Sequence, residues 1–158
     1  MFEKENLELW FKIPDQPYSK AREYLNDEQI AILLNKRLEA YAAMQHRLPG
    51  KQVFDDFLDY MKSSREKIGK YPLEIVNTLL DILGELAPTE KWVSIWDITD
   101  RLNQKLFSSE DQQNRRITGV KVGNLLRLLG FNERKRIRLA THCLVRHDIL
   151  RLYRKEVV

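Results

Sequence analysis

Four polar residues recur at helical spacing late in the chain: Thr118, Lys121, Asn124 and Arg127. On a helix, residues three apart lie on the same face. An Asn side chain pairs bidentately with adenine and an Arg side chain with guanine, whereas Lys and Thr contact bases or phosphates. The spacing predicts a helix that presents these groups to the major groove of DNA. The alternative, that they form only the solvated face of an amphipathic helix, stays open.

A second group of basic residues surrounds this helix in the sequence. Four of its members crowd one short segment of the chain, which reads as a strand of a β-hairpin. Such a hairpin can straddle the DNA backbone or the minor groove, and arginine suits both positions. The predicted phosphate contacts are Arg115, Arg116, Arg134, Lys135, Arg136, Arg138 and Arg146. An acidic partner protein, or a merely solubilising role, remains the alternative.

The charges of the chain are segregated along its length. From residue 115 to the end there are twelve Lys and Arg residues and three acids, a net charge of +9. The preceding residues hold fifteen bases and twenty acids, a net charge of −5, and together they give +4. A basic module attached to an acidic one is typical of proteins that meet a polyanion, most often nucleic acid.

Signals for catalysis are missing from the sequence. There is no phosphate-binding Gly-x-x-x-x-Gly-Lys-Ser/Thr loop, and no nucleophile can be paired with a base. His142, Cys143 and His147 lie close together, but their spacing matches no common zinc pattern. Asp55, Asp56 and Asp59 read as helical acids facing water. We therefore expect no enzyme, no cofactor and no metal site.

Composition bounds the remaining possibilities. The 158 residues suit one medium domain or two small ones, and the five prolines and six glycines favour a mostly helical chain. A single cysteine excludes an internal disulfide framework. No apolar run reaches the roughly 18–20 residues of a membrane span, and no secretory signal opens the chain. These features predict a soluble, cytoplasmic protein with no membrane partner.

The first predicted domain, residues 1–70, is a helical segment with a short leading strand. Leu7, Leu9, Phe11 and Ile13 alternate with polar neighbours, which predicts a strand that ends at Pro14. A helix then begins after Asn26, with Gln29 in the capping-box position, and a second helix covers residues 52–68. The apolar stripes of these two helices predict a helical hairpin.

The second predicted domain, residues 71–158, carries the basic residues. Its expected order is helix, short strand, helix, polar loop, helix, strand, strand and short helix. Ser94 and Thr118 are expected to cap the second and third helices, and Gly130 to end the third. The strands are expected at residues 133–139 and 142–145, with Trp92 and Trp96 closing the core. This order predicts a mainly α chain whose second domain is a winged helix-turn-helix with a small β-hairpin wing.

One stretch of the chain resembles a known kind of module. It includes the sequences Trp92-Val93-Ser94, Ile98-Thr99-Asp100-Arg101-Leu102-Asn103 and Ile117-Thr118-Gly119-Val120-Lys121-Val122-Gly123-Asn124-Leu125-Leu126-Arg127-Leu128-Leu129-Gly130-Phe131. These are similar to the winged-helix region near the C-terminus of primase–helicase-type replication ATPases of plasmids, phages and integrated elements. The resemblance implies a DNA-binding module, as a fragment or a stand-alone relative without the motor.

The sequence therefore predicts a winged-helix module that binds duplex or forked DNA and serves replication, helicase or primase activity of a mobile element. A replication ATPase or helicase would be its further partner. One alternative is an autonomous dimeric transcription regulator, with the apolar faces of residues 26–68 as the dimer interface. The other is a protein–protein interaction scaffold whose basic hairpin binds an acidic partner.

Overall fold

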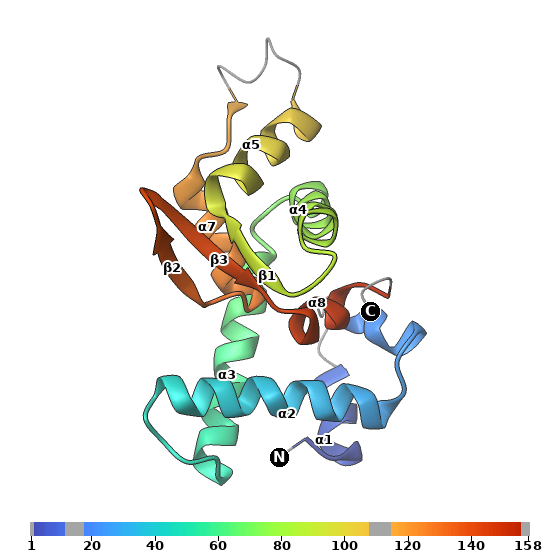
Figure 1. Cartoon of the computed structure of the whole chain (residues 1–158). Helices are drawn as coiled ribbons and strands as arrows, with labels where there is room; N and C mark the ends of the chain where they lie inside the picture. The colour runs from blue at the N-terminus through green and yellow to red at the C-terminus, as the bar shows by residue number, and fades with distance from the viewer. Residues whose placement is uncertain (1, 12–17, 108–114, 156–158) are drawn as a thin grey trace. The chain divides into compact units, whose positions relative to one another are not determined.

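The computed structural model describes residues 2–11, 18–107 and 115–155. Over these residues the chain is mainly helical, with a small antiparallel sheet of three strands (Figure 1). It divides into two compact units, one formed by Met1–Glu66 with Arg151–Glu156 and the other chiefly by Lys67–Leu150. In the described part of the chain, no helix is both long enough and apolar enough to cross a membrane.

The leading strand predicted at Leu7–Ile13 is wrong, because α1 covers Lys4–Phe11 as a helix. Leu7 and Trp10 are both buried, and so is Phe2 just before the helix. Residues three apart share a face of a helix but lie on opposite faces of a strand, so only a helix buries Leu7 and Trp10 together. Ile13 and Pro14, where the predicted strand ends, lie outside the described residues.

The two helices predicted in the first unit are formed, as α2 (Asp27–Met44) and α3 (Lys51–Ile68), but they cross at a steep angle instead of packing side by side as a helical hairpin (Figure 1). Asn26 caps α2 with the expected capping box, since its side chain accepts from the Gln29 backbone and the Gln29 side chain accepts in return. A short 3₁₀ helix, η1 (Ser19–Glu23), precedes α2. The side chains of the predicted stripes that are buried in this unit are Ile30, Leu33, Leu34, Leu38, Val53, Phe54, Phe57 and Met61. Most of the apolar surface that a dimer would use is therefore covered within the chain.

The second unit packs three helices around one sheet. They are α4 (Leu73–Leu86), α5 (Ile95–Leu106) and α7 (Gly119–Leu129), and α5 contacts both of the other helices. The strands β1 (Lys91–Ser94), β2 (Arg134–Ile137) and β3 (Ala140–Val145) pair antiparallel in the order β1-β3-β2. The predicted order of helices and strands is confirmed for the described residues.

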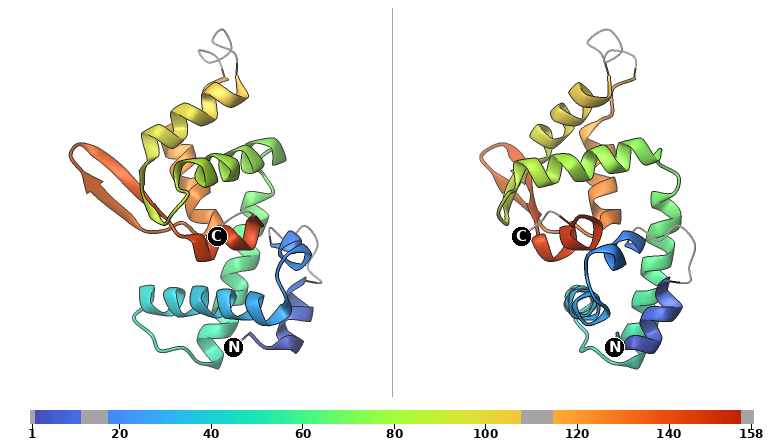
Figure 2. Two further views of the ribbon diagram at one scale, coloured as in Figure 1. Left: turned by 45° about the vertical axis from the view of Figure 1, so that its right-hand side comes forward. Right: turned by 90° about the vertical axis from the view of Figure 1, so that its right-hand side faces the viewer.

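The β2–β3 hairpin extends outward from the helices of the second unit, as the left view of Figure 2 shows. Its turn comes earlier than predicted, because Ile137 pairs with Ala140 and only Arg138 and Leu139 connect the strands. Arg138 adopts a left-handed φ of 56°. Two-residue hairpin turns need such a conformation and usually use Gly or Asn. No such residue marks the turn, so the sequence placed the bend at Ala140-Thr141 instead.

The last helix, α8 (His147–Tyr153), is shared by the two units. It is the short last helix that the sequence predicted, and its Ile149, Leu152 and Tyr153 side chains are buried. The predicted domain boundary assigned this whole helix to residues 71–158. Its second half instead groups with the first unit, where the Tyr153 ring meets Tyr18 edge-on at 4.6 Å.

Candidate nucleic-acid interface

Helix α7 and its N-cap, Thr118, carry the four residues that the sequence singled out. The Thr118 hydroxyl accepts from the Lys121 backbone N–H at 3.3 Å, and Gly130 ends the helix with a φ of 109°. One face of the helix is buried, and its side chains are Val122, Leu125, Leu126 and Leu129. Thr118, Lys121, Asn124 and Arg127 are all exposed. The predicted face is therefore open to a partner.

A buried amide on α5 fixes the start of α7. Asn103 Oδ1 accepts from the Ile117 N–H at 2.7 Å, and its Nδ2 donates to the Ile117 carbonyl at 2.9 Å. The same Nδ2 donates to the Thr99 carbonyl at 3.0 Å. These bonds orient the residue before the Thr118 cap, although the polar loop between the helices is long. The sequence analysis missed Asn103, because an Asn inside an apolar stripe does not reveal its partner.

A groove of about 760 Å³ lies between α7, the start of α5 and the hairpin. It joins segments that are up to 46 positions apart, from Ile95 to Thr141. Its lining includes five of the predicted contact residues: Arg116, Thr118, Asn124, Arg127 and Arg134. None of its described lining residues carries a carboxylate. The groove is therefore a cationic concavity that an anion could enter without repulsion from its walls.

Arg134 lines this groove and is also bound within the fold, and its predicted role as a phosphate contact stays a prediction. Its guanidinium donates to the carbonyls of Phe131 and Glu133, and to Gly123 O on α7 at 3.1 Å. It also donates to the buried Cys143 sulfur at 3.2 Å. Burial lowers the pKa of Arg134, and the nearby charge of Arg127 lowers it further. These bonds fasten the hairpin to α7.

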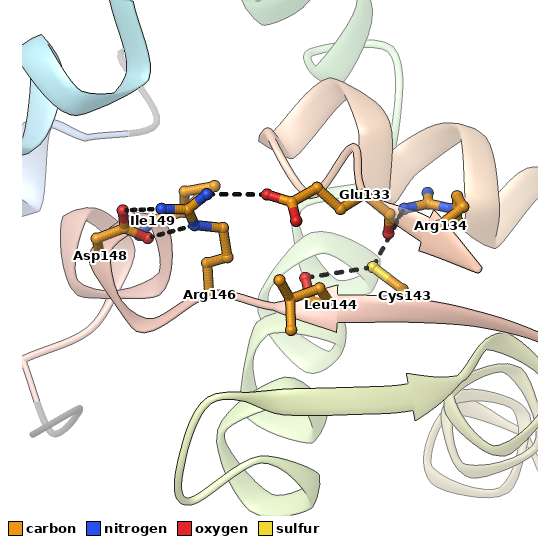
Figure 3. A network of polar contacts seen from close by, with 7 residues as sticks. All are labelled: Glu133, Arg134, Cys143, Leu144, Arg146, Asp148 and Ile149. Carbon is orange, nitrogen blue, oxygen red and sulfur yellow. Dashed lines mark hydrogen bonds and ion pairs between the residues drawn. The ribbon is translucent and has the colours of Figure 1, made fainter. Parts of the chain in front are cut away.

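Arg146 also forms ion pairs within the fold, and its predicted phosphate contact stays a prediction. Figure 3 shows its guanidinium between two carboxylates. It lies 2.8 Å from Glu133 and 3.0 Å from Asp148. The hydrogen bond that Arg146 donates to the Glu133 carboxylate is the main cause that raises the pKa of Arg146. Asp148 also accepts from the Ile149 N–H at 2.9 Å, so this network joins the hairpin to the start of α8.

The remaining hairpin bases divide between the two faces of the sheet. Arg136 stands opposite Thr141, which lines the groove, and two positions from Arg134 on the same strand. Because cross-strand partners and alternate residues share a face, Arg136 belongs to the groove face. Lys135 belongs to the other face, where its ammonium lies 4.5 Å from the centre of the Trp92 ring.

Three further bases are exposed near the groove or at its ends. Arg138 occupies the hairpin turn, and Arg115 and Arg116 precede the Thr118 cap. Arg116 lines the groove, whereas Lys121 and Arg115 do not. Within the described ranges, no ion pair involves Arg116, Arg127, Arg136 or Arg138. These four cations are the strongest candidates for phosphate contacts.

Exposed apolar side chains gather in the same groove. Trp96 is 67% exposed, Val120 74% and Leu139 91%, and all three line it. The prediction that Trp96 closes the core is wrong. Ile98 and Leu102 define the buried stripe of α5, and Trp96 lies two residues before Ile98, on another face. That spacing was a usable signal for its exposure.

The histidines and the cysteine of the hairpin region do not converge on one point. Cys143 is buried, and burial raises the pKa of its thiol to about 11. A ring nitrogen of His142 lies 3.1 Å from the Ala140 carbonyl, and one of His147 lies 2.8 Å from the Ala87 carbonyl. The described residues include no group of three or more His, Cys, Asp or Glu side chains that could hold a metal ion.

Comparisons of the chain with protein-family models, with curated proteins and with solved structures give no match. The case for a function therefore depends on the residues and geometry of the groove.

Proposed function

We propose that the second unit is a winged helix-turn-helix that binds DNA. In this interpretation α7 is the recognition helix and the β2–β3 hairpin is the wing. The order α4, β1, α5, α7, β2, β3 and the sheet order β1-β3-β2 support it. The capped start of α7, held by Asn103, would enter the major groove first, as recognition helices do.

The observation that carries the proposal is the pairing of α7 with the hairpin across one cationic groove. Arg116 and Arg127 line this groove, and no described lining residue is acidic. Arg136 lies on the same face of the hairpin, by its register with Thr141. Phosphates would neutralise these neighbouring positive charges, which repel one another in the free protein. Asn124 and Arg127 have side chains that can read adenine and guanine edges.

We further propose that this unit assists replication, helicase or primase activity of a mobile element, with a replication ATPase or helicase as partner. Support for this step comes from the resemblance of residues 72–156 to the winged-helix region of such ATPases. The dimeric alternative is less favoured, because most of the apolar stripes of residues 26–68 are buried within the first unit.

Charge reversal at one groove position tests the DNA-binding proposal. Arg127→Glu should weaken binding of a labelled duplex about ten-fold or more, since one good side-chain contact to DNA is worth about 1–3 kcal/mol. Lys62→Glu makes the same charge change at an exposed position on α3, outside the groove. It should leave the dissociation constant within about two-fold. Equal weakening by both variants would mean that net charge, not the groove, governs binding.

A further inference from the structure

We propose that the groove receives an unpaired base of a DNA strand, which stacks on Trp96. The inference rests on the proposed function and deepens it, because it names DNA with unpaired nucleotides, as at a fork, as the preferred substrate class. It starts from an observation that charge alone does not explain. Apolar side chains on three different segments are exposed in one basic groove.

The positions of these side chains argue for a shared ligand. Trp96 comes from α5, Val120 from the first turn of α7, and Leu139 from the hairpin turn. Removing any one of these side chains from contact with water would stabilise the protein, yet the fold leaves all three exposed. Gathered on one concave surface, they make an apolar element that a partner can cover.

The partner must combine a flat apolar surface with negative charge. Arg116 and Arg127 line the same groove, and its described lining has no carboxylate. In a paired duplex the bases are stacked, and the thymine methyl is the main apolar group offered in the major groove. An unpaired nucleotide instead presents the whole face of its base beside a phosphate. Proteins that bind single strands use this combination of aromatic stacking platforms and basic grooves.

The groove, of about 760 Å³, also has the volume to hold a base. Gly119 and Gly123 both line it, so no side chain projects from α7 at these two positions. Asn124 lies one residue further along, and its amide can pair with the polar edge of a base. Stacking on Trp96 and pairing with Asn124 would then act on the same nucleotide, while Arg116 or Arg127 contacts its phosphate.

Binding of two matched oligonucleotides tests the inference. One is a fully paired duplex, and the other is the same duplex with an unpaired single-stranded extension. The wild-type protein should bind the second more tightly. Trp96→Ala should weaken binding of the extended oligonucleotide about ten-fold, because base–aromatic stacking is worth about 1–3 kcal/mol per base. Binding of the paired duplex should stay within about two-fold, and Trp96→Phe should recover most of the loss.

Two controls separate stacking from other effects. Leu73→Ala removes another exposed apolar side chain of the second unit, outside the groove, and should change neither affinity. A Trp92→Phe protein leaves Trp96 as the exposed tryptophan of the groove, since Trp10 is buried in the first unit. Its tryptophan emission should be quenched by the extended oligonucleotide more strongly than by the paired duplex.

The outcomes distinguish this inference from the proposal beneath it. If neither oligonucleotide binds, the DNA-binding function itself fails. If both bind with equal affinity, or if Trp96→Ala leaves binding of the extended oligonucleotide unchanged, DNA binding stands and the stacking inference is overturned. The apolar side chains would then serve a protein partner. Equal weakening of both oligonucleotides by Trp96→Ala would also overturn it, because Trp96 would contact paired DNA.

Discussion

Asn103 holds the backbone of Ile117 by both of its polar groups, with its amide oxygen 2.7 Å from the Ile117 nitrogen and its amide nitrogen 2.9 Å from the Ile117 carbonyl. The pair joins the end of α5 to the residue before the Thr118 cap. These two hydrogen bonds connect α5 to the start of α7, although no tight turn joins the two helices in the sequence. This buried side chain fixes the start of α7, while the buried apolar face of α7 packs against the rest of the second unit.

Asn103→Ala should lower the free energy of unfolding by about 2–3 kcal/mol, because it leaves the Ile117 N–H and carbonyl without their side-chain partner. Urea denaturation of the two proteins measures the loss. Gln104→Ala removes a neighbouring, exposed amide that donates to the Asp100 side chain, and should cost less than about 0.5 kcal/mol. Equal effects of the two variants would contradict the role given to Asn103.

Replacing Arg134 by alanine should mainly lower the stability of the protein, whereas replacing Arg136 by alanine should mainly affect DNA binding. Arg134→Ala removes charged hydrogen bonds to Phe131 and Gly123, and should lower stability by about 2–3 kcal/mol. Arg136→Ala should leave stability within about 0.5 kcal/mol but reduce the salt dependence of DNA binding by about one unit of slope. Thermal unfolding and salt titrations measure the two effects. A stable Arg134→Ala protein with weakened DNA binding would instead support the sequence-based prediction that Arg134 contacts a phosphate.

Gly123→Ala should raise stability by about 0.5–1 kcal/mol. Glycine inside a helix is unfavourable relative to alanine, and the added methyl would lie at ordinary contact distance, 3.9 Å from Ile95 Cδ1. Gly130→Ala is the matched comparison. It should destabilise the protein by at least about 1 kcal/mol, because Gly130 has a φ of 109°. A loss of stability in Gly123→Ala would show that the glycine is required for packing.

Stability should fall as the pH rises from about 9 to 11. Burial raises the pKa of the Cys143 thiol from 9.0 to about 11 in the folded protein. In this range the unfolded chain loses the thiol proton and the folded chain keeps it, so alkali favours unfolding. The contribution of Cys143 is roughly 2–3 kcal/mol. Burial also raises the pKa of Tyr24 to about 12, which acts in the same direction.

Urea unfolding at pH 8, 9, 10 and 11 measures this decline. Cys143→Ala removes the thiol and should make the curve shallower between pH 9 and 11. Tyr24→Phe should also make the decline in stability shallower, but at a slightly higher pH. A Cys143→Ala protein that declines as steeply as the wild type would show that the thiol titrates alike in both states.

The parts of the fold governed by local rules could be predicted from the sequence. Asn26, Ser94 and Thr118 cap helices as expected, because capping depends on a side chain and a backbone N–H three residues away. Gly130 ends α7 for an equally local reason. The leading segment was mistaken for a strand because its apolar residues fit both the two-residue period of a strand and the period of a helix. Only the folded chain, in which Leu7 and Trp10 are buried together, decides for the helix.

The sequence could not show which basic residues are bound within the fold and which are left without such bonds. Arg134 and Arg136 are two residues apart and identical in type, yet only Arg134 reaches Gly123 on another helix. Arg146 resembles a phosphate contact until Glu133 and Asp148 are found on either side of it. These roles depend on contacts between separate elements. The exposure of Trp96, by contrast, follows from the stripe of α5.

The salt dependence of DNA affinity tests the central claim most directly. Fluorescence anisotropy gives the binding constant of a labelled oligonucleotide over a range of salt concentrations. With five to six phosphates neutralised, the logarithm of the binding constant should fall with the logarithm of salt at a slope of about −5. In a protein with Arg116, Arg127 and Arg136 all changed to Ala, the slope should shrink to about −2. An unchanged slope in that protein, or no salt dependence in the wild type, would contradict the account.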